Sequence, residues 1–242
     1  MPITETLMSQ IYTPKKVTAI EQLISDIHNN NVNHHSREIY LHGHMDGVDE
    51  EEPGVDYRMA TKFIKNVHIL EAQNHQNILI HMHTIGGSWS DGMAMFNTIR
   101  LIHSPVTILS YAQASSMSGI ILQAADKRVL LPDCEIMIHH GTVSVSDNTI
   151  AVKSAVDQNE KYCKRMLQIF AQRAIMGKYF TDRNYGLKKT MNFIDSKIRH
   201  NSDWYLAADE AIYYGFADGI LGEKGFETLT KIRTGRKKKD IN

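Results

Sequence analysis

Apolar positions along the chain follow two spacings, and each spacing predicts one kind of element. Apolar residues three or four positions apart predict a helix with one buried face, whereas short apolar runs between turn residues predict buried strands. Strands are expected at 37–43, 77–83, 106–110, 128–131 and 135–139. Helices are expected at 17–27, 57–73, 89–103, 115–125, 149–176 and 209–214.

The order of these elements predicts the fold class. From residue 37 onward strands alternate with helices, which is typical of an α/β domain with largely parallel strands and right-handed crossovers. Residues 1–36 are polar and are expected to form a peripheral arm. Near the C-terminus, residues 236–239 are consecutively basic, and we expect a frayed, solvated end there rather than a nucleic-acid site.

The balance of charges argues against an overall electrostatic field as the basis of function. The 242 residues include 27 Lys plus Arg and 27 Asp plus Glu, so the formal net charge is zero. Such a chain has no overall field to attract nucleic acid or a membrane, and little charge to oppose self-association. We therefore expect neither nucleic acid nor a membrane among its partners.

Cysteine content and hydropathy favour a cytoplasmic protein. Cys134 and Cys163 are too few for a disulfide framework and lack metal-site spacing, which fits a reducing compartment. Residues 1–29 lack the continuous apolar core of a secretory signal, and no stretch approaches the roughly 18 apolar residues of a membrane span.

Metal, nucleotide and other cofactor sites are not expected. The pairs His42-x-His44 and His81-x-His83 each place two imidazoles on one face of a strand, but neither pair has an obvious third ligand. The acidic segment 46–56 is expected to be a solvated loop rather than a cation site. No nucleotide-binding loop is visible, so any use of ATP would belong to a partner.

A candidate nucleophile opens the helix expected after the third strand. Ser116 lies in the segment Ala112-Gln113-Ala114-Ser115-Ser116-Met117-Ser118-Gly119. A serine at a helix start lies at the positive end of the helix dipole, beside N–H groups that have no partner within the helix. These groups can face the anionic oxygen that forms in acyl transfer. Alternatively, the small residues allow close packing or cap the helix.

Four further residues lie where a site can form. Gly86 and Gly87 directly follow a strand, so the backbone can approach a ligand there or simply turn. His139 ends a strand, at the edge where α/β sheets collect functional groups, and the neighbouring His140 points to the opposite face. Asp203 precedes a short helix and is either an acceptor that orients a histidine or a surface residue.

Several segments, taken in order, resemble the ClpP family, the proteolytic subunit of Clp protease. The resemblance covers about residues 37–222, and several motifs in the right order are far more specific than any one of them. The segments are His83-Thr84-Ile85-Gly86-Gly87-Ser88 with Asp91–Ile99, Ala112–Met117, Ile136–His140, and Ser202–Leu206 with Glu210-Ala211 and Tyr214–Ile220.

The resemblance implies a role for each candidate residue. It makes Ser116 the nucleophile, His139 the general base and Asp203 the residue that orients the histidine. Gly87 and Met117 become the backbone donors of an oxyanion hole.

The resemblance also implies an architecture and partners. The ClpP/crotonase fold repeats β-β-α units and carries a projecting handle, which would span about 149–200. Residues 223–242 lie beyond the resemblance and are expected to form a basic tail. Handles of the family interdigitate between stacked rings that enclose the active sites. This implies self-association, unfolded chains or short peptides as substrates, and an AAA+ unfoldase as a partner.

The sequence departs from the family pattern near the candidate site. Ile85 replaces the usual proline, which leaves the turn before the glycine pair less constrained. Ser115 and Ser118 replace an alanine and a glycine, so Ser115 could compete for the histidine, and His140 replaces a glutamine. Extra residues are expected around 180–198, at the end of the handle, where they would alter ring contacts.

Three hypotheses follow from these features. The first is a serine endopeptidase that works through an acyl-enzyme. The second is a crotonase-type acyl-CoA enzyme, because an oxyanion hole serves both chemistries. The third is an inactive structural subunit of a ClpP-like ring, suggested by Ile85 and the altered handle. A relative of signal-peptide peptidases is disfavoured, because no membrane anchor is present.

Overall fold

The computed structural model describes residues 17–42 and 54–233. The acidic loop expected at 46–56 lies mostly outside the described residues, and His44 and the basic run 236–239 lie wholly outside them. No described helix is both long and apolar enough to cross a membrane.

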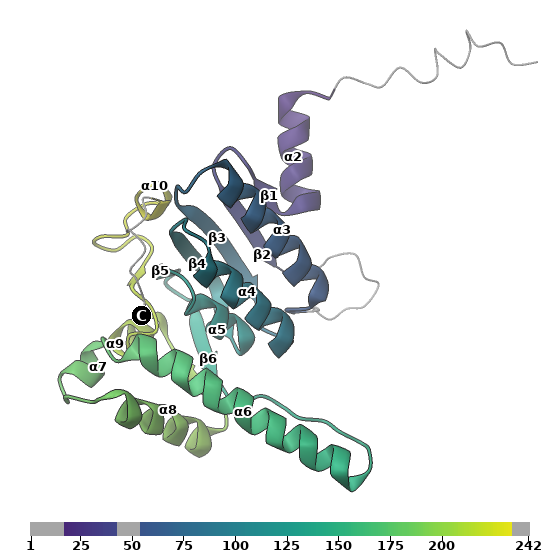
Figure 1. Ribbon diagram of the computed structural model, residues 1–242. Helices are drawn as coiled ribbons and strands as arrows, with labels where there is room; N and C mark the ends of the chain where they lie inside the picture. The colour runs from purple at the N-terminus through teal and green to yellow at the C-terminus, as the bar shows by residue number, and fades with distance from the viewer. Residues whose placement is uncertain (1–16, 43–53, 234–242) are drawn as a thin grey trace, which may run out of the picture.

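The described residues form an eight-stranded sheet at the centre of the molecule (Figure 1). Its hydrogen-bonded order is β1-β2-β3-β4-β5-β8, and β6 and β7 branch from β4. Only the pairs β1–β2 and β6–β7 are antiparallel, which confirms the largely parallel α/β fold. The strands are β1 Val32–Asn33, β2 Glu38–His42, β3 Ile78–Thr84, β4 Val106–Ser115, β5 Lys127–Leu130, β6 Glu135–Ile138, β7 Trp204–Leu206 and β8 Gly219–Ile220.

Strand β4 is the point at which the sheet branches. Its first half, from Thr107 to Ser110, pairs with β5, and its end, from Gln113 to Ser115, pairs with β6. It therefore runs about twice as far as the expected strand 106–110 and delivers the chain directly to Ser116. The helix predicted at 115–125 is correspondingly shorter.

Helices cover the sheet and project beyond it (Figure 1). Helix α3 shows why these elements form: the Asp56 carboxylate caps its first turn by accepting from the Met59 N–H at 2.8 Å. The apolar positions on one face, including Phe63, Val67 and Leu70, are buried. The helices are α2 Ala19–Asn30, α3 Tyr57–Gln73, α4 Trp89–Leu101, α5 Met117–Leu122, α6 Thr149–Ala174, α7 Lys178–Thr181, α8 Leu187–Asn201, α9 Ala208–Tyr213 and α10 Leu229–Arg233.

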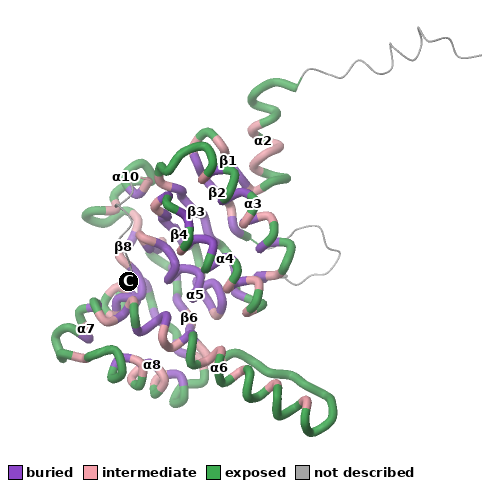
Figure 2. The backbone as a smooth tube through the Cα atoms, viewed as in Figure 1, coloured by how far each residue is buried: buried purple, intermediate pink, exposed green. Residues whose placement is uncertain are grey.

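The segment predicted as the handle, about 149–200, consists of α6, α7 and α8. The first half of α6 extends away from the body and is largely exposed, as Figure 2 shows, whereas its second half buries Met166, Ile169 and Phe170. Helix α8 contacts α6 and was not predicted as an element. Aromatic side chains join this region to the body by ring contacts; they include Tyr179, Phe180, Phe193, Trp204 and Tyr214.

The arm and the tail are more firmly attached than composition predicted. Helix α2 buries none of its residues, as expected of an arm, but β1 pairs with β2 and buries Val32. In the tail, Ile232 is fully buried against Leu79, Leu109 and Val129. Within the predicted tail 223–242, one apolar side chain thus anchors α10 to the sheet.

Candidate active site

Ser116 lies at a sharp turn between β4 and α5. Its φ of 54° and ψ of −123° fall outside the regions that non-glycine residues usually occupy. The Ser116 N–H donates to the Met137 carbonyl at 2.9 Å, which extends the β4–β6 pairing up to the turn. Surrounding structure must hold such a strained residue, and this conformation between a strand and a helix presents the hydroxyl outward.

Polar contacts hold this turn against the end of β3. The Ser118 Oγ lies 2.9 Å from the Thr84 carbonyl oxygen and 2.6 Å from the Ser115 carbonyl oxygen, and it can donate to either. Gly86 packs directly on the turn: with φ of 101°, a Cβ there would lie 2.6 Å from the Ser115 oxygen. Any other residue at Gly86 would displace the serine.

The structure brings the three predicted side chains into one chain of contacts. His139 Nε2 lies 2.7 Å from Ser116 Oγ, and His139 Nδ1 lies 3.4 Å from Asp203 Oδ1. The second distance is long for a hydrogen bond, but such bonds commonly tighten only when substrate binds. With its hydrogen on Nδ1 facing the carboxylate, His139 can accept the serine proton at Nε2.

Strand pairing explains why these distant residues meet. Ser115 at the end of β4 is opposite Met137 of β6, and Ile138 of β6 is opposite Trp204 of β7. Because β6 pairs with both strands, the residues that follow β4, follow β6 and precede β7 emerge at one edge of the sheet. Those residues are Ser116, His139 and Asp203.

Two possible competitors are engaged elsewhere. The Ser115 hydroxyl donates to the Gln113 side-chain oxygen at 3.4 Å, not to the catalytic candidate His139. His140 Nε2 lies 2.9 Å from Asp195 Oδ1 of α8, and Arg199 Nε donates to the other oxygen of that carboxylate at 2.8 Å. Asp195, paired with Arg199, therefore holds His140 away from Ser116.

The predicted oxyanion donors lie beside the serine turn. Met117 is the first residue of α5, so its N–H has no acceptor within the helix. Gly87 follows Gly86, and a Cβ added to Gly86 would lie 2.8 Å from the Met117 nitrogen. The segment 86–87 therefore packs directly on the start of α5. Val55 fixes the Gly87 segment by accepting from the Ser88 N–H at 2.8 Å.

A cleft of about 640 Å³ opens beside Ser116 and His139. The loop 141–144 lines one side of it, and the handle helix α6 lines another. Trp89 at the start of α4 stacks on Tyr162 of α6, with ring centroids 4.7 Å apart, and ties the handle to the body. The apolar lining includes Met117, Ile120, Ile138, Met166 and Phe170.

Two residues at or near this cleft, one of which lines it, were not among the predicted site residues. Asp195 pairs with His140 from a helix that was not predicted, although Ile194 and Ile198, four positions apart, signal a buried helix face. Cys163 also lines the cleft, and its thiol donates to the His140 carbonyl at 3.2 Å. Burial raises the pKa of the Cys163 thiol, so it stays protonated and is not a rival nucleophile.

Comparisons with known proteins agree on one family. The family model described as Clp protease matches residues 51–224. The chain is 26% identical over 172 residues to the ATP-dependent Clp protease proteolytic subunit of Deinococcus radiodurans, which covers 70% of this chain and 77% of the relative.

Two further relatives carry the same name, ATP-dependent Clp protease proteolytic subunit. The protein from Leuconostoc citreum is 28% identical over 183 residues, covering 73% of this chain and 84% of the relative. The protein from Streptococcus equi subsp. equi is 30% identical over 176 residues, covering 69% of this chain and 80% of the relative. Together with the match over residues 51–224, they show that this chain belongs to the Clp protease family.

Proposed function

We propose that this protein is a serine endopeptidase that hydrolyses peptide bonds through an acyl-enzyme, as the proteolytic subunit of a Clp-type assembly. The observation that carries the proposal is the 2.7 Å contact between His139 Nε2 and Ser116 Oγ at the edge of a cleft. Membership of the Clp protease family supports the same chemistry.

Each candidate residue has one task in the reaction. His139 Nε2 takes the Ser116 proton while Oγ attacks the scissile carbonyl carbon. The N–H groups of Gly87 and Met117 donate to the negative oxygen of the tetrahedral intermediate. His139 then returns the proton to the leaving amine as the C–N bond breaks, and Asp203 keeps the imidazole oriented throughout. Water then attacks the acyl carbonyl carbon while His139 takes a proton from it. His139 returns this proton to Ser116 Oγ as the ester bond breaks.

The cleft supports polypeptides as substrates. An extended chain fits between the Gly86–Gly87 segment and the loop 141–144, where backbone groups on both sides can pair with it as added strands. The apolar lining beside Ser116 suits an apolar side chain next to the scissile bond. These steps require no cofactor, because the serine, the histidine and the two backbone amides supply the nucleophile, the base and the anion donors.

Assembly and location extend this proposal. The relatives are named subunits of an ATP-dependent protease, so we expect this chain to form rings through its handle and to receive unfolded chains from an AAA+ unfoldase that uses the ATP. We expect it to work in the cytoplasm, where its two free cysteines stay reduced.

The two other hypotheses have less support. An acyl-CoA enzyme would use the amide donors but has no need for the contact between Ser116 and His139. An inactive subunit has no need for the strained φ of 54° at Ser116, which costs free energy unless it serves a purpose.

Hydrolysis of a short fluorogenic peptide by the assembled protein tests the proposal. Ser116→Ala should lower kcat by about 10⁶-fold, because only the oxyanion donors and binding would remain. Ser115→Ala is the matched control and should retain most of the activity, since its hydroxyl contacts Gln113 instead. Equal activity in the wild type and Ser116→Ala would exclude the serine mechanism.

A further inference from the structure

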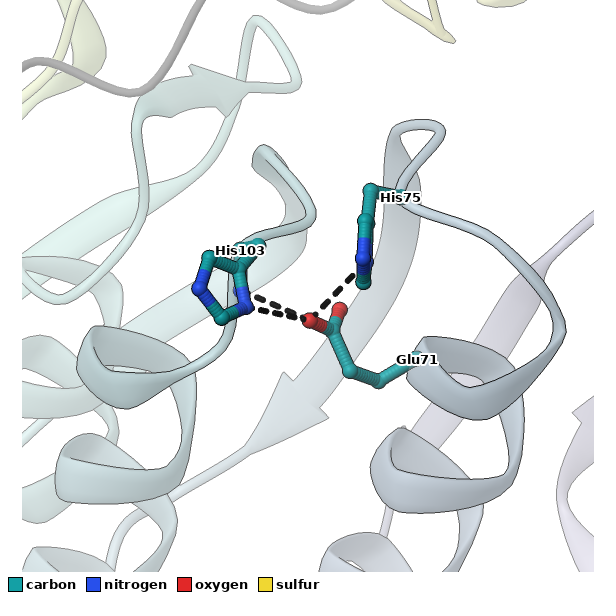
Figure 3. Close-up of side chains that lie close together, drawn as sticks. All are labelled: Glu71, His75 and His103. Carbon is teal, nitrogen blue, oxygen red and sulfur yellow. Dashed lines mark hydrogen bonds and ion pairs between the residues drawn. The ribbon is translucent and has the colours of Figure 1, made fainter.

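A second cluster of titratable side chains lies at the opposite ends of the same strands. Glu71 belongs to the last turn of α3, His75 to the loop between α3 and β3, and His103 to the loop between α4 and β4. Figure 3 shows the three side chains converging from these segments. The three residues lie near the starts of β3 and β4, whereas Ser116 follows the last residue of β4.

The ligand atoms of this trio have the separations of a metal site. His75 Nδ1 and His103 Nδ1 each lie 3.1 Å from Glu71 Oε1, and the three ligand atoms all lie within 4.8 Å of one another. Donors bound to one tetrahedral Zn²⁺ at about 2.0–2.1 Å are about 3.4 Å apart. Both imidazoles are exposed, so small rotations can bring them to this distance.

Backbone N–H groups hold the Glu71 carboxylate in place. The Ser104 N–H donates to Oε2 at 3.1 Å, and the His103 N–H donates to Oε1 at 2.8 Å. Glu71 is therefore fixed in position.

The framework behind the trio is rigid. Arg37 is buried, and its guanidinium donates to the carbonyls of Leu70, Asn74 and Gln76 and to the Ser104 hydroxyl, at 2.7 to 3.1 Å. One side chain thus joins the end of α3 to both loops that carry the histidines. Support of this kind behind the ligands lowers the reorganisation that binding requires.

The donor crowding at Glu71 also favours a cation. Two imidazole nitrogens and one backbone N–H all approach Oε1, more donors than the two lone pairs of one oxygen accept well. A metal ion would bond to the two Nδ1 atoms in place of these hydrogen bonds, and each neutral imidazole would carry its proton on Nε2 instead.

We propose that Glu71, His75 and His103 bind one Zn²⁺ ion per chain, with the fourth position open to water. Two imidazoles and one carboxylate are ligands that zinc takes readily, whereas magnesium and calcium prefer oxygen ligands throughout. The ion would join the α3–β3 and α4–β4 loops and so stabilise this end of the sheet. This site is independent of the peptidase chemistry, because none of its residues lines the cleft.

Calorimetric titration of the chelator-treated full chain with Zn²⁺ tests the proposal. We expect one tight ion per chain, and His75→Ala and His103→Ala should each weaken its binding by about 10-fold or more. His68→Ala is the matched control: it removes an exposed histidine from the same helix α3 and should leave the affinity unchanged. Absence of tight Zn²⁺ binding, or equal weakening by His68→Ala, would overturn the proposal.

Cobalt provides a second measurement that reports on geometry. Co²⁺ in place of Zn²⁺ should give the intense visible absorption of a four-coordinate site in the wild type and in His68→Ala, and His103→Ala should lose it. A weak spectrum typical of six-coordinate, water-rich Co²⁺ in the wild type would contradict the three-ligand site. Both results are obtained without any activity assay, so failure of the peptidase proposal would not affect them.

Discussion

Adjacent residues His139 and His140 each pair with an aspartate, but the two pairs differ in every other respect. His139 lies 2.7 Å from Ser116 and 3.4 Å from Asp203, whose side chain is 42% exposed. His140 lies 2.9 Å from Asp195, and that carboxylate is also bound by Arg199. His139 Nε2 contacts a hydroxyl group with which it can exchange a proton, whereas the contact of His140 with α8 is structural only.

The comparison teaches that a histidine–aspartate pair alone does not identify a catalytic residue. The difference lies in what the opposite ring nitrogen faces. Nε2 of His139 faces a strained serine at the start of a helix, while Nε2 of His140 is the very atom that binds its aspartate. Replacing each member of the two pairs should therefore give effects of very different size.

The largest effect is expected at His139. His139→Ala removes the base, and kcat for a short peptide should fall by about 10⁶-fold, as for loss of the serine. The double variant with Ser116→Ala should be no worse than either single variant, because the two residues act as one unit. Additive losses in steady-state assays would show that they do not.

Asp203 should rank second. Asp203→Asn keeps the shape but loses the charge that selects the Nδ1–H form of the imidazole, and kcat should fall by about 10⁴-fold. Circular dichroism should show an unchanged fold, since the carboxylate is partly exposed. An activity close to that of the wild type would show that Asp203 does not orient His139 and that another acceptor does.

His140 should have a much smaller effect on turnover. His140→Ala breaks the contact between the cleft and α8, and we expect a loss of about 1 kcal/mol in the free energy of unfolding with kcat reduced by less than about 10-fold. Urea denaturation and peptide hydrolysis measure the two quantities separately. A fall in kcat as large as that expected for His139→Ala would mean that the contacts of the two histidines do not distinguish their roles.

Arg199 should matter least. Its side chain is 71% exposed and lies one helical turn from Asp195, so Arg199→Ala should leave stability almost unchanged. Activity should be unchanged, and added salt should reduce the difference from the wild type. A measurable change in kcat would show that α8 acts on the catalytic residues more directly than the contacts indicate.

Much of this site could be predicted because its signals are local. The helix at 57–73 follows from apolar spacing, and Ser116 and His139 each follow an apolar strand. The pairing of β6 with both β4 and β7 could not be predicted, although it is what brings Asp203 to His139. Similarly, the contact of Asp195 with His140 and the trio of Glu71, His75 and His103 depend on segments that meet only in the folded chain.

The limits of residue patterns are clearest at Ser116. Sequence predicted a helix from 115, but the strand continues through Ser115 and the chain turns at a positive φ before α5 begins. Propensity cannot show such a turn, because its strain is balanced by contacts from Thr84, Gly86 and Met137, which are distant in sequence.

Labelling by a fluorophosphonate measures most directly whether His139 and Asp203 make Ser116 nucleophilic. Mass spectrometry of the assembled wild-type protein should find one phosphonyl group per chain, on Ser116, and His139→Ala should label far more slowly while His140→Ala labels at nearly the wild-type rate. Labelling on another serine, or equal labelling rates for the wild type and His139→Ala, would contradict the account.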